Sequence, residues 1–92
     1  MNMAIFWDSQ ACSENLTLHN ADFDPRIIES KTSLHSFKTV YSTEPLVQGN
    51  RYYFEVKFLK GCNFKIGVCK NKRYMETSFC DYPEGYGYYS AG

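Results

Sequence analysis

The stretch that decides the fold is Gly49–Cys69, which reads GNRYYFEVKFLKGCNFKIGVC. Large apolar side chains occupy every second position in the run Tyr52–Phe58, and a second alternating run covers Phe64–Val68. A period of two is typical of a β-strand with one buried face. Because a short segment containing Gly61 separates the runs, the pattern predicts a β-hairpin in the middle of a sheet.

Shorter strand patterns flank this hairpin on both sides. Before it, residues 15–18, 26–29 and 36–43 have strand composition, and after it residues 83–92 predict a turn followed by a strand. Clusters of Asn, Asp, Pro and Gly between these runs are typical of turns. No stretch has sustained helical periodicity. Short strands spaced by turns indicate an all-β fold, a sandwich or barrel, formed as a single domain by residues 1–92.

Charge and composition argue against several classes of partner. Ten basic and ten acidic residues cancel to a formal net charge of zero, so we expect no nucleic-acid partner. The basic cluster at residues 70–73 is expected to be a solvated loop tip, with a phosphate contact as the alternative. No apolar run approaches the roughly 20 residues of a membrane span, and no secretory signal is present. We therefore expect no membrane partner and a cytoplasmic location, with the nucleus also compatible.

The residues that carry chemistry predict no enzyme. Cys12, Cys62, Cys69 and Cys80 include no C-x-x-C pair, so reduced thiols are expected rather than a zinc site. His19 lies in a turn and His35 lies beside a strand, and both are expected at the surface. No glycine-rich phosphate loop precedes a helix. We therefore assign no catalytic residue, no cofactor and no metal.

Four motifs follow one another in an order that resembles the SPRY domain of the B30.2/SPRY family. They are Trp7-Asp8 with Ser13, Leu16 and Leu18; Thr39-Val40-Tyr41 leading to Pro45-Leu46 and Gly49; Tyr52-Tyr53-Phe54-Glu55-Val56 with Ile66-Gly67-Val68; and the run from Glu84 to Gly92. The resemblance covers nearly all of the chain. It implies an antiparallel β-sandwich of the SPRY or concanavalin-like jelly-roll type.

The resemblance also implies that the sandwich is incomplete. SPRY domains continue past their glycine-aromatic strand into further strands, whereas this sequence stops at Gly92. We therefore expect residues 86–89 to border a sheet face that lacks its cover. Open strand edges and uncovered apolar faces favour pairing with another chain, so a second polypeptide, or self-association with another copy, is expected to supply the cover.

The function that the resemblance implies is protein binding. In the family, rigid strands present variable loops at one end of the sandwich to short segments of partner proteins, as in substrate-selecting adaptors of ubiquitin ligation or signalling scaffolds. The corresponding loops here are residues 22–26 and 71–75. The expected contacts with a protein or peptide partner, chosen by position and residue type, come from Arg26, Arg73, Tyr74 and Met75. The alternative is a structural subunit that a second chain completes within a larger assembly.

Overall fold

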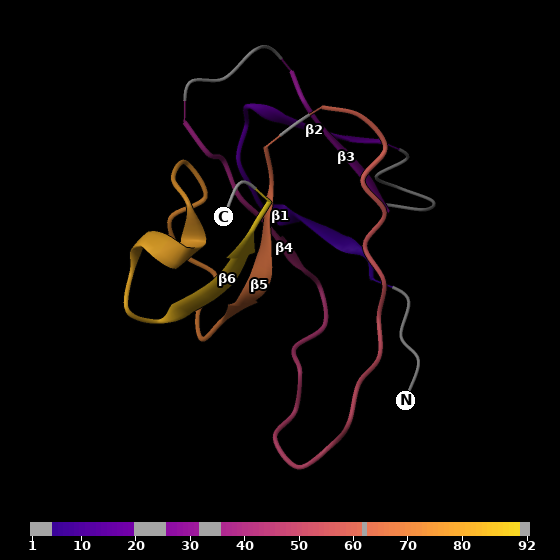
Figure 1. Ribbon diagram of the computed structural model, residues 1–92, viewed down its shortest axis with the longest axis vertical. Coiled ribbons are helices and arrows are strands. Elements are labelled where there is room, and N and C mark those ends of the chain that lie inside the picture. Colours follow the sequence, from indigo (N-terminus) through magenta and orange to yellow (C-terminus); the bar gives the residue numbers. More distant parts are fainter. Residues whose placement is uncertain (1–4, 20–25, 32–35, 62, 91–92) are drawn as a thin grey trace.

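A computed structural model describes residues 5–19, 26–31, 36–61 and 63–90 of the chain (Figure 1). The elements in these ranges are β1 (Trp7–Cys12), β2 (Leu16–His19), β3 (Ile27–Ser30), β4 (Val40–Ser42), β5 (Lys65–Cys69), the short 3₁₀-helix η1 (Phe79–Asp81) and β6 (Gly85–Tyr89). The predicted all-β class is confirmed for the described residues. The sandwich is not, because the strands form small open sheets.

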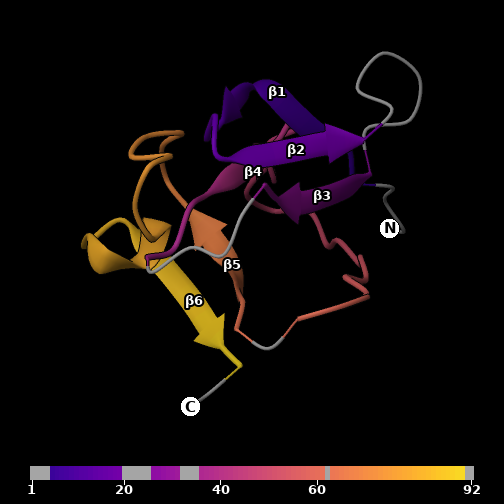
Figure 2. The same ribbon diagram turned by 90° about the horizontal axis from the view of Figure 1, so that it is seen from above.

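The described strands pair as three antiparallel ribbons of two strands each, β1 with β4, β2 with β3 and β5 with β6. The β2–β3 ribbon is regular, with Leu16 opposite Ser30 at one end and His19 opposite Ile27 at the other. Figures 1 and 2 show the β5–β6 ribbon on one side of the molecule and the β2–β3 ribbon on the other. Strand β1 of the remaining ribbon contacts β2.

The predicted central hairpin is wrong in its pairing. Its second run does form a strand, β5, but the partner of β5 is β6, with Ile66 opposite Tyr88. Its first run, residues 52–58, forms no strand and contains only an isolated bridge at Tyr53. Alternation shows which side chains of a segment share a face, but it carries no information about which strand lies beside that segment.

Glycines explain why β5 accepts β6 as its partner. Gly67 lies directly opposite Gly87 in the ribbon. A Cβ atom on Gly67 would lie 1.9 Å from the carbonyl oxygen of Tyr86, far inside van der Waals contact. The two backbones therefore approach more closely at this point than any residue with a side chain permits.

The flanking strand predictions are largely confirmed. Residues 15–18 and 26–29 correspond to β2 and β3, each displaced by one residue, and residues 83–92 contain β6. The strand predicted over residues 36–43 is reduced to the three residues of β4. Strand β1 has no predicted counterpart, because its sequence WDSQAC places polar side chains among the apolar ones on both faces.

The buried centre of the molecule is small and mostly polar. In the described ranges its buried residues are Ala11, Ser13, Thr39 and Ser78. Among the residues that the structure describes, the following large apolar side chains are exposed instead: Phe6, Ile27, Leu46, Val47, Tyr53, Val56, Phe58, Leu59, Val68, Tyr74, Tyr86, Tyr88 and Tyr89. Because apolar burial is the main stabilising contribution to folding, a fold with so small a centre has much to gain from a partner that covers these side chains.

Candidate functional site

A polar cluster holds the loop after β5 against the rest of the molecule. Oε1 of Glu76 accepts hydrogen bonds of 2.9 Å from the Ser13 hydroxyl and from Nδ2 of Asn15. Nζ of Lys38 lies 3.7 Å from the same oxygen and donates to the Glu76 carbonyl oxygen at 2.9 Å. The Ser13 bond is the main reason that the pKa of Glu76 is lowered. The carboxylate is thus held in its charged form and links the loop after β5 to residues 13–15 and to Lys38.

Strand β4 and the residue before it hold the same loop from another side. The Thr39 amide donates to the Met75 carbonyl oxygen at 2.7 Å, and its hydroxyl donates to the Thr77 carbonyl oxygen at 2.6 Å. The Tyr41 hydroxyl donates to the Arg73 carbonyl oxygen. Burial, with added contributions from Cys69, raises the pKa of Tyr41 to about 12. The backbone of residues 73–77 is therefore fixed by side chains, although it belongs to no strand.

Three of the predicted binding residues lie on this fixed loop. Arg73 and Tyr74 are exposed, and Met75 is half-buried. Tyr74 has a φ of 60°, in the left-handed region that side chains other than glycine rarely adopt. Its ring stacks on Tyr82 with the ring centres 3.8 Å apart and the planes at 17°. The loop therefore presents a rigid aromatic pair at the surface.

The fourth predicted residue, Arg26, lies elsewhere. Its carbonyl oxygen accepts a hydrogen bond of 3.0 Å from Nε1 of Trp7, and its guanidinium carbon lies 5.9 Å from the centre of the Phe6 ring. Figures 1 and 2 place this end of β3 across the molecule from the loop that carries Tyr74. The structure therefore does not bring Arg26 together with the other three residues. Residues 22–25 of the first predicted loop lie outside the described residues.

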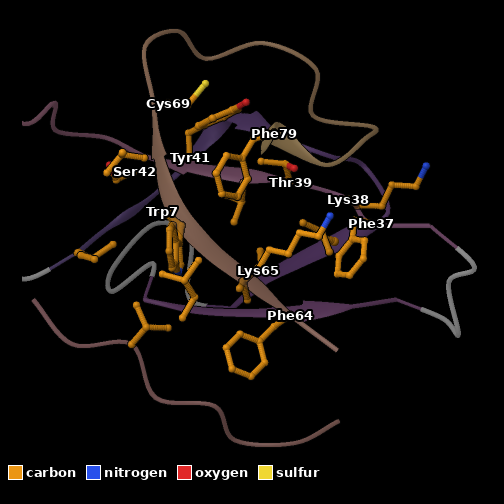
Figure 3. A pocket seen from close by; sticks show the side chains of 18 of the residues that line it. Trp7, Phe37, Lys38, Thr39, Tyr41, Ser42, Phe64, Lys65, Cys69 and Phe79 are labelled. Atoms are coloured by element: carbon orange, nitrogen blue, oxygen red, sulfur yellow. The ribbon is translucent and has the colours of Figure 1, made fainter. Parts of the chain in front are cut away.

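A large open cavity is the feature that sequence reasoning missed. It has a volume of about 1980 Å³, is widely open to solvent, and is lined by residues 53–61 together with side chains from every described strand. Figure 3 shows the rings of Trp7, Tyr41 and Phe79 gathered around β5. No local sequence motif predicts this cavity. The sequence feature nearest to it is the alternating run of residues 52–58, which forms no strand in the structure.

One of the cations that line the cavity, Lys65, already has several contacts. Nζ of Lys65 lies 4.3 Å from the centre of the Phe37 ring and 5.2 Å from that of Tyr89, and these rings meet edge to face at 5.3 Å. Nζ also donates to Oγ of Ser78 at 3.0 Å. Figure 3 shows the Lys65 side chain pointing toward Phe37. Such cation–π contacts are favourable, so this lysine acts as a structural link rather than as a free positive charge.

The described thiols and imidazole show ordinary surroundings. Cys12, Cys69 and Cys80 are free, and burial raises the pKa of Cys12, which favours its neutral thiol. His19 is exposed, as predicted, and its Nε2 lies 3.1 Å from Oε1 of Glu29; Cys62 and His35 lie outside the described residues. Within the described ranges no group of three or more His, Cys, Asp or Glu side chains is placed to hold a metal ion.

The described chain also contains no helix that is both long and apolar enough to cross a membrane. Comparison of the sequence and the structure with family models, with curated proteins and with solved structures finds no match. The resemblance to SPRY domains therefore stands on the four sequence motifs alone.

Proposed function

We propose that this chain is a non-catalytic protein-binding domain whose cavity takes up an extended segment of a partner polypeptide. The observation that carries the proposal is the size of the cavity, about 1980 Å³. Pockets for small molecules measure roughly 300–1,000 Å³, so a drug-sized ligand would leave much of this space empty. A polypeptide segment fills it with both backbone and side chains.

The lining of the cavity supports an apolar, extended occupant. Its walls include large apolar side chains from two facing segments: Phe54, Val56, Phe58, Phe64 and Ile66. Residues 54–61 belong to no ladder among the described residues, so their backbone is available for hydrogen bonds. Addition of a strand to such an edge combines main-chain hydrogen bonds with pockets for alternate side chains.

The proposal is compatible with the two roles that the SPRY resemblance implies. An adaptor or scaffold would bind the segment reversibly, and a structural subunit would keep it permanently. The exposed apolar surface favours the second role, because large uncovered apolar patches are typical of surfaces that another chain covers.

A second candidate site is the loop of residues 73–77. It is favoured by the left-handed conformation of Tyr74, since strained backbone conformations concentrate at functional sites. The stacked ring of Tyr74 remains 46 % exposed and is positioned by the cluster around Glu76. A rigid aromatic side chain of this kind is a common anchor in protein interfaces.

The two sites are separated by selecting peptides against the purified chain from a random display library and measuring their affinity by fluorescence anisotropy. We expect selected peptides with alternating apolar residues, and at least about tenfold weaker binding in Val56→Asp, because binding would bury the new charge. The matched control is Val47→Asp, since Val47 is also exposed and does not line the cavity.

Loss of binding in Tyr74→Ala but not in Val56→Asp would move the site to the loop. Failure to select any binding peptide, with the chain folded by circular dichroism, would overturn the proposal.

A further inference from the structure

We infer that residues 51–61, called here the free segment, pair with the same segment of a second copy as antiparallel strands centred on Val56. The inference deepens the proposed function and rests on it, because it names the polypeptide that completes the fold. It arises from the backbone, the side-chain alternation and the charges of the free segment.

The backbone of the free segment is available. Within the described chain, residues 54–61 enter no ladder, and the isolated bridge at Tyr53 can use only one edge of the backbone. Figure 1 shows this part of the trace running along the outside of the molecule. One edge is thus open along its length to a strand from outside.

The side chains of the free segment alternate in exposure over residues 51–55, where Tyr52 and Phe54 are half-buried between exposed neighbours. On one side, the Tyr53 hydroxyl donates to Oε1 of Glu55, two residues away. Phe58 belongs to the other set, and its ring centre lies 4.4 Å from that of Phe64 in β5. The segment therefore has a polar-aromatic side and an apolar side before any partner arrives.

The sequence of the free segment is self-complementary about Val56. Antiparallel pairing centred there sets Glu55 opposite Lys57 of the second copy, and the two-fold symmetry repeats this ion pair. The same register pairs Phe54 with Phe58 and Tyr53 with Leu59, so apolar residues meet apolar residues over residues 53–59, while Tyr52 lies opposite Lys60 and Arg51 opposite Gly61. Opposite charges and apolar pairs directly across two strands are stabilising.

Other registers lose this match. Parallel in-register pairing sets Glu55 against Glu55 and Lys57 against Lys57, and antiparallel pairing centred on either residue sets it against its own copy. Like charges in these positions destabilise a sheet. A shift by one residue places the charged side of one strand on the apolar side of the other. Among these registers, the one centred on Val56 alone satisfies both charge and polarity.

The pairing also covers side chains that the single chain leaves open. Tyr53 is 55 % exposed and Leu59 is 64 % exposed, and each becomes the cross-strand neighbour of the other. Val56 and Phe58, 41 % and 45 % exposed, join with their copies into one apolar face. This face borders the cavity on both copies.

Charge exchange tests the register by sedimentation equilibrium. The unmodified chain should dimerise, and Glu55→Lys or Lys57→Glu alone should each weaken the dimer about tenfold or more, since both ion pairs become repulsions. The double variant should recover the dimer, and so should an equimolar mixture of the two single variants. A monomeric unmodified chain, or a double variant as weak as the single ones, would overturn the inference.

Cross-linking provides a measurement that does not depend on the charged residues. Because Val56 faces its own copy on the two-fold axis, Val56→Cys should form an intermolecular disulfide through that position, identified by peptide mass mapping. The matched control, Val47→Cys, introduces a comparably exposed thiol and should form none. Equal cross-linking of both variants would contradict the register. Peptide binding in the cavity by a chain that never dimerises would refute this inference while leaving the proposed function intact.

Discussion

The hydroxyl of Ser13 donates a hydrogen bond of 2.9 Å to Oε1 of Glu76, a residue 63 positions further along the chain. Ser13 is only 1 % exposed, whereas the side chain of Glu76 is 52 % exposed. The bond therefore joins the buried end of the β1–β2 connection to a surface carboxylate. Through it, the loop that carries Tyr74 is attached to the first ribbon of the molecule.

The first prediction concerns this bond. We expect Ser13→Ala to lower the free energy of unfolding by about 1 kcal/mol, because a part-buried hydrogen bond to a solvent-screened carboxylate is lost. The Asn15 amide, which donates to the Ser13 hydroxyl at 3.1 Å, also loses its acceptor. Urea denaturation measures the change. Ser9→Ala, an exposed position in β1, is the control and should stay within about 0.5 kcal/mol of the unmodified chain; equal effects would contradict the prediction.

The second prediction is a loss of stability in acid. The Ser13 bond lowers the pKa of Glu76 from 4.5, and the bond from Lys72 lowers the pKa of Asp8 from 3.8. The unfolded chain therefore binds more protons, so this stabilisation is complete above about pH 4.5 and is lost as the pH falls through the lower folded values. Urea midpoints measured from pH 7 to pH 3 should fall less steeply in the variant Glu76→Gln with Asp8→Asn. An unchanged slope would show that these bonds do not stabilise the fold.

The third prediction concerns the stability of the fold at alkaline pH. Burial of Tyr41 raises its pKa to about 12 from 10, so the folded chain holds this proton longer than the unfolded one. The resulting stabilisation is full below pH 10 and is lost as the pH rises toward 12. Absorbance of tyrosinate should show a component that titrates near pH 12 and disappears in Tyr41→Phe. Tyr53→Phe is the control, because the pKa of Tyr53 is raised by its bond to Glu55 rather than chiefly by burial. A late component that survives Tyr41→Phe would refute the assignment.

The fourth prediction concerns the β5–β6 ribbon. Gly67→Ala should lower the free energy of unfolding by about 3 kcal/mol. Its Cβ would lie 1.9 Å from the carbonyl oxygen of Tyr86, which cannot move without separating the two strands. Gly49→Ala meets no atom within 4 Å and is strained only by its φ of +93°, so about 1 kcal/mol is expected. Thermal unfolding of both variants checks the order. A larger effect at Gly49 would mean that the ribbon is looser than described.

The candidate site was only partly predictable from the sequence. Arg73, Tyr74 and Met75 were expected together because they are neighbours in the chain, and they do share a loop. Their separation from Arg26 has no local signal, since it follows from where β3 lies relative to β5 and β6. The hydrogen bond by which Glu76 holds the loop could not be predicted from the sequence either, because Ser13 and Glu76 lie 63 positions apart and form no motif.

The amino-acid sequence by itself determined the β-rich character of the chain, its balanced charge and the positions of β2, β3, β5 and β6 to within a few residues. These are local properties, since alternation and turn residues act over a few neighbours. Only the tertiary structure decided that β5 pairs with β6, that residues 52–58 remain without a ladder and that a cavity opens beside them. Those outcomes depend on which backbones can approach, as Gly67 and Gly87 allow, and on polar contacts between residues far apart in the chain.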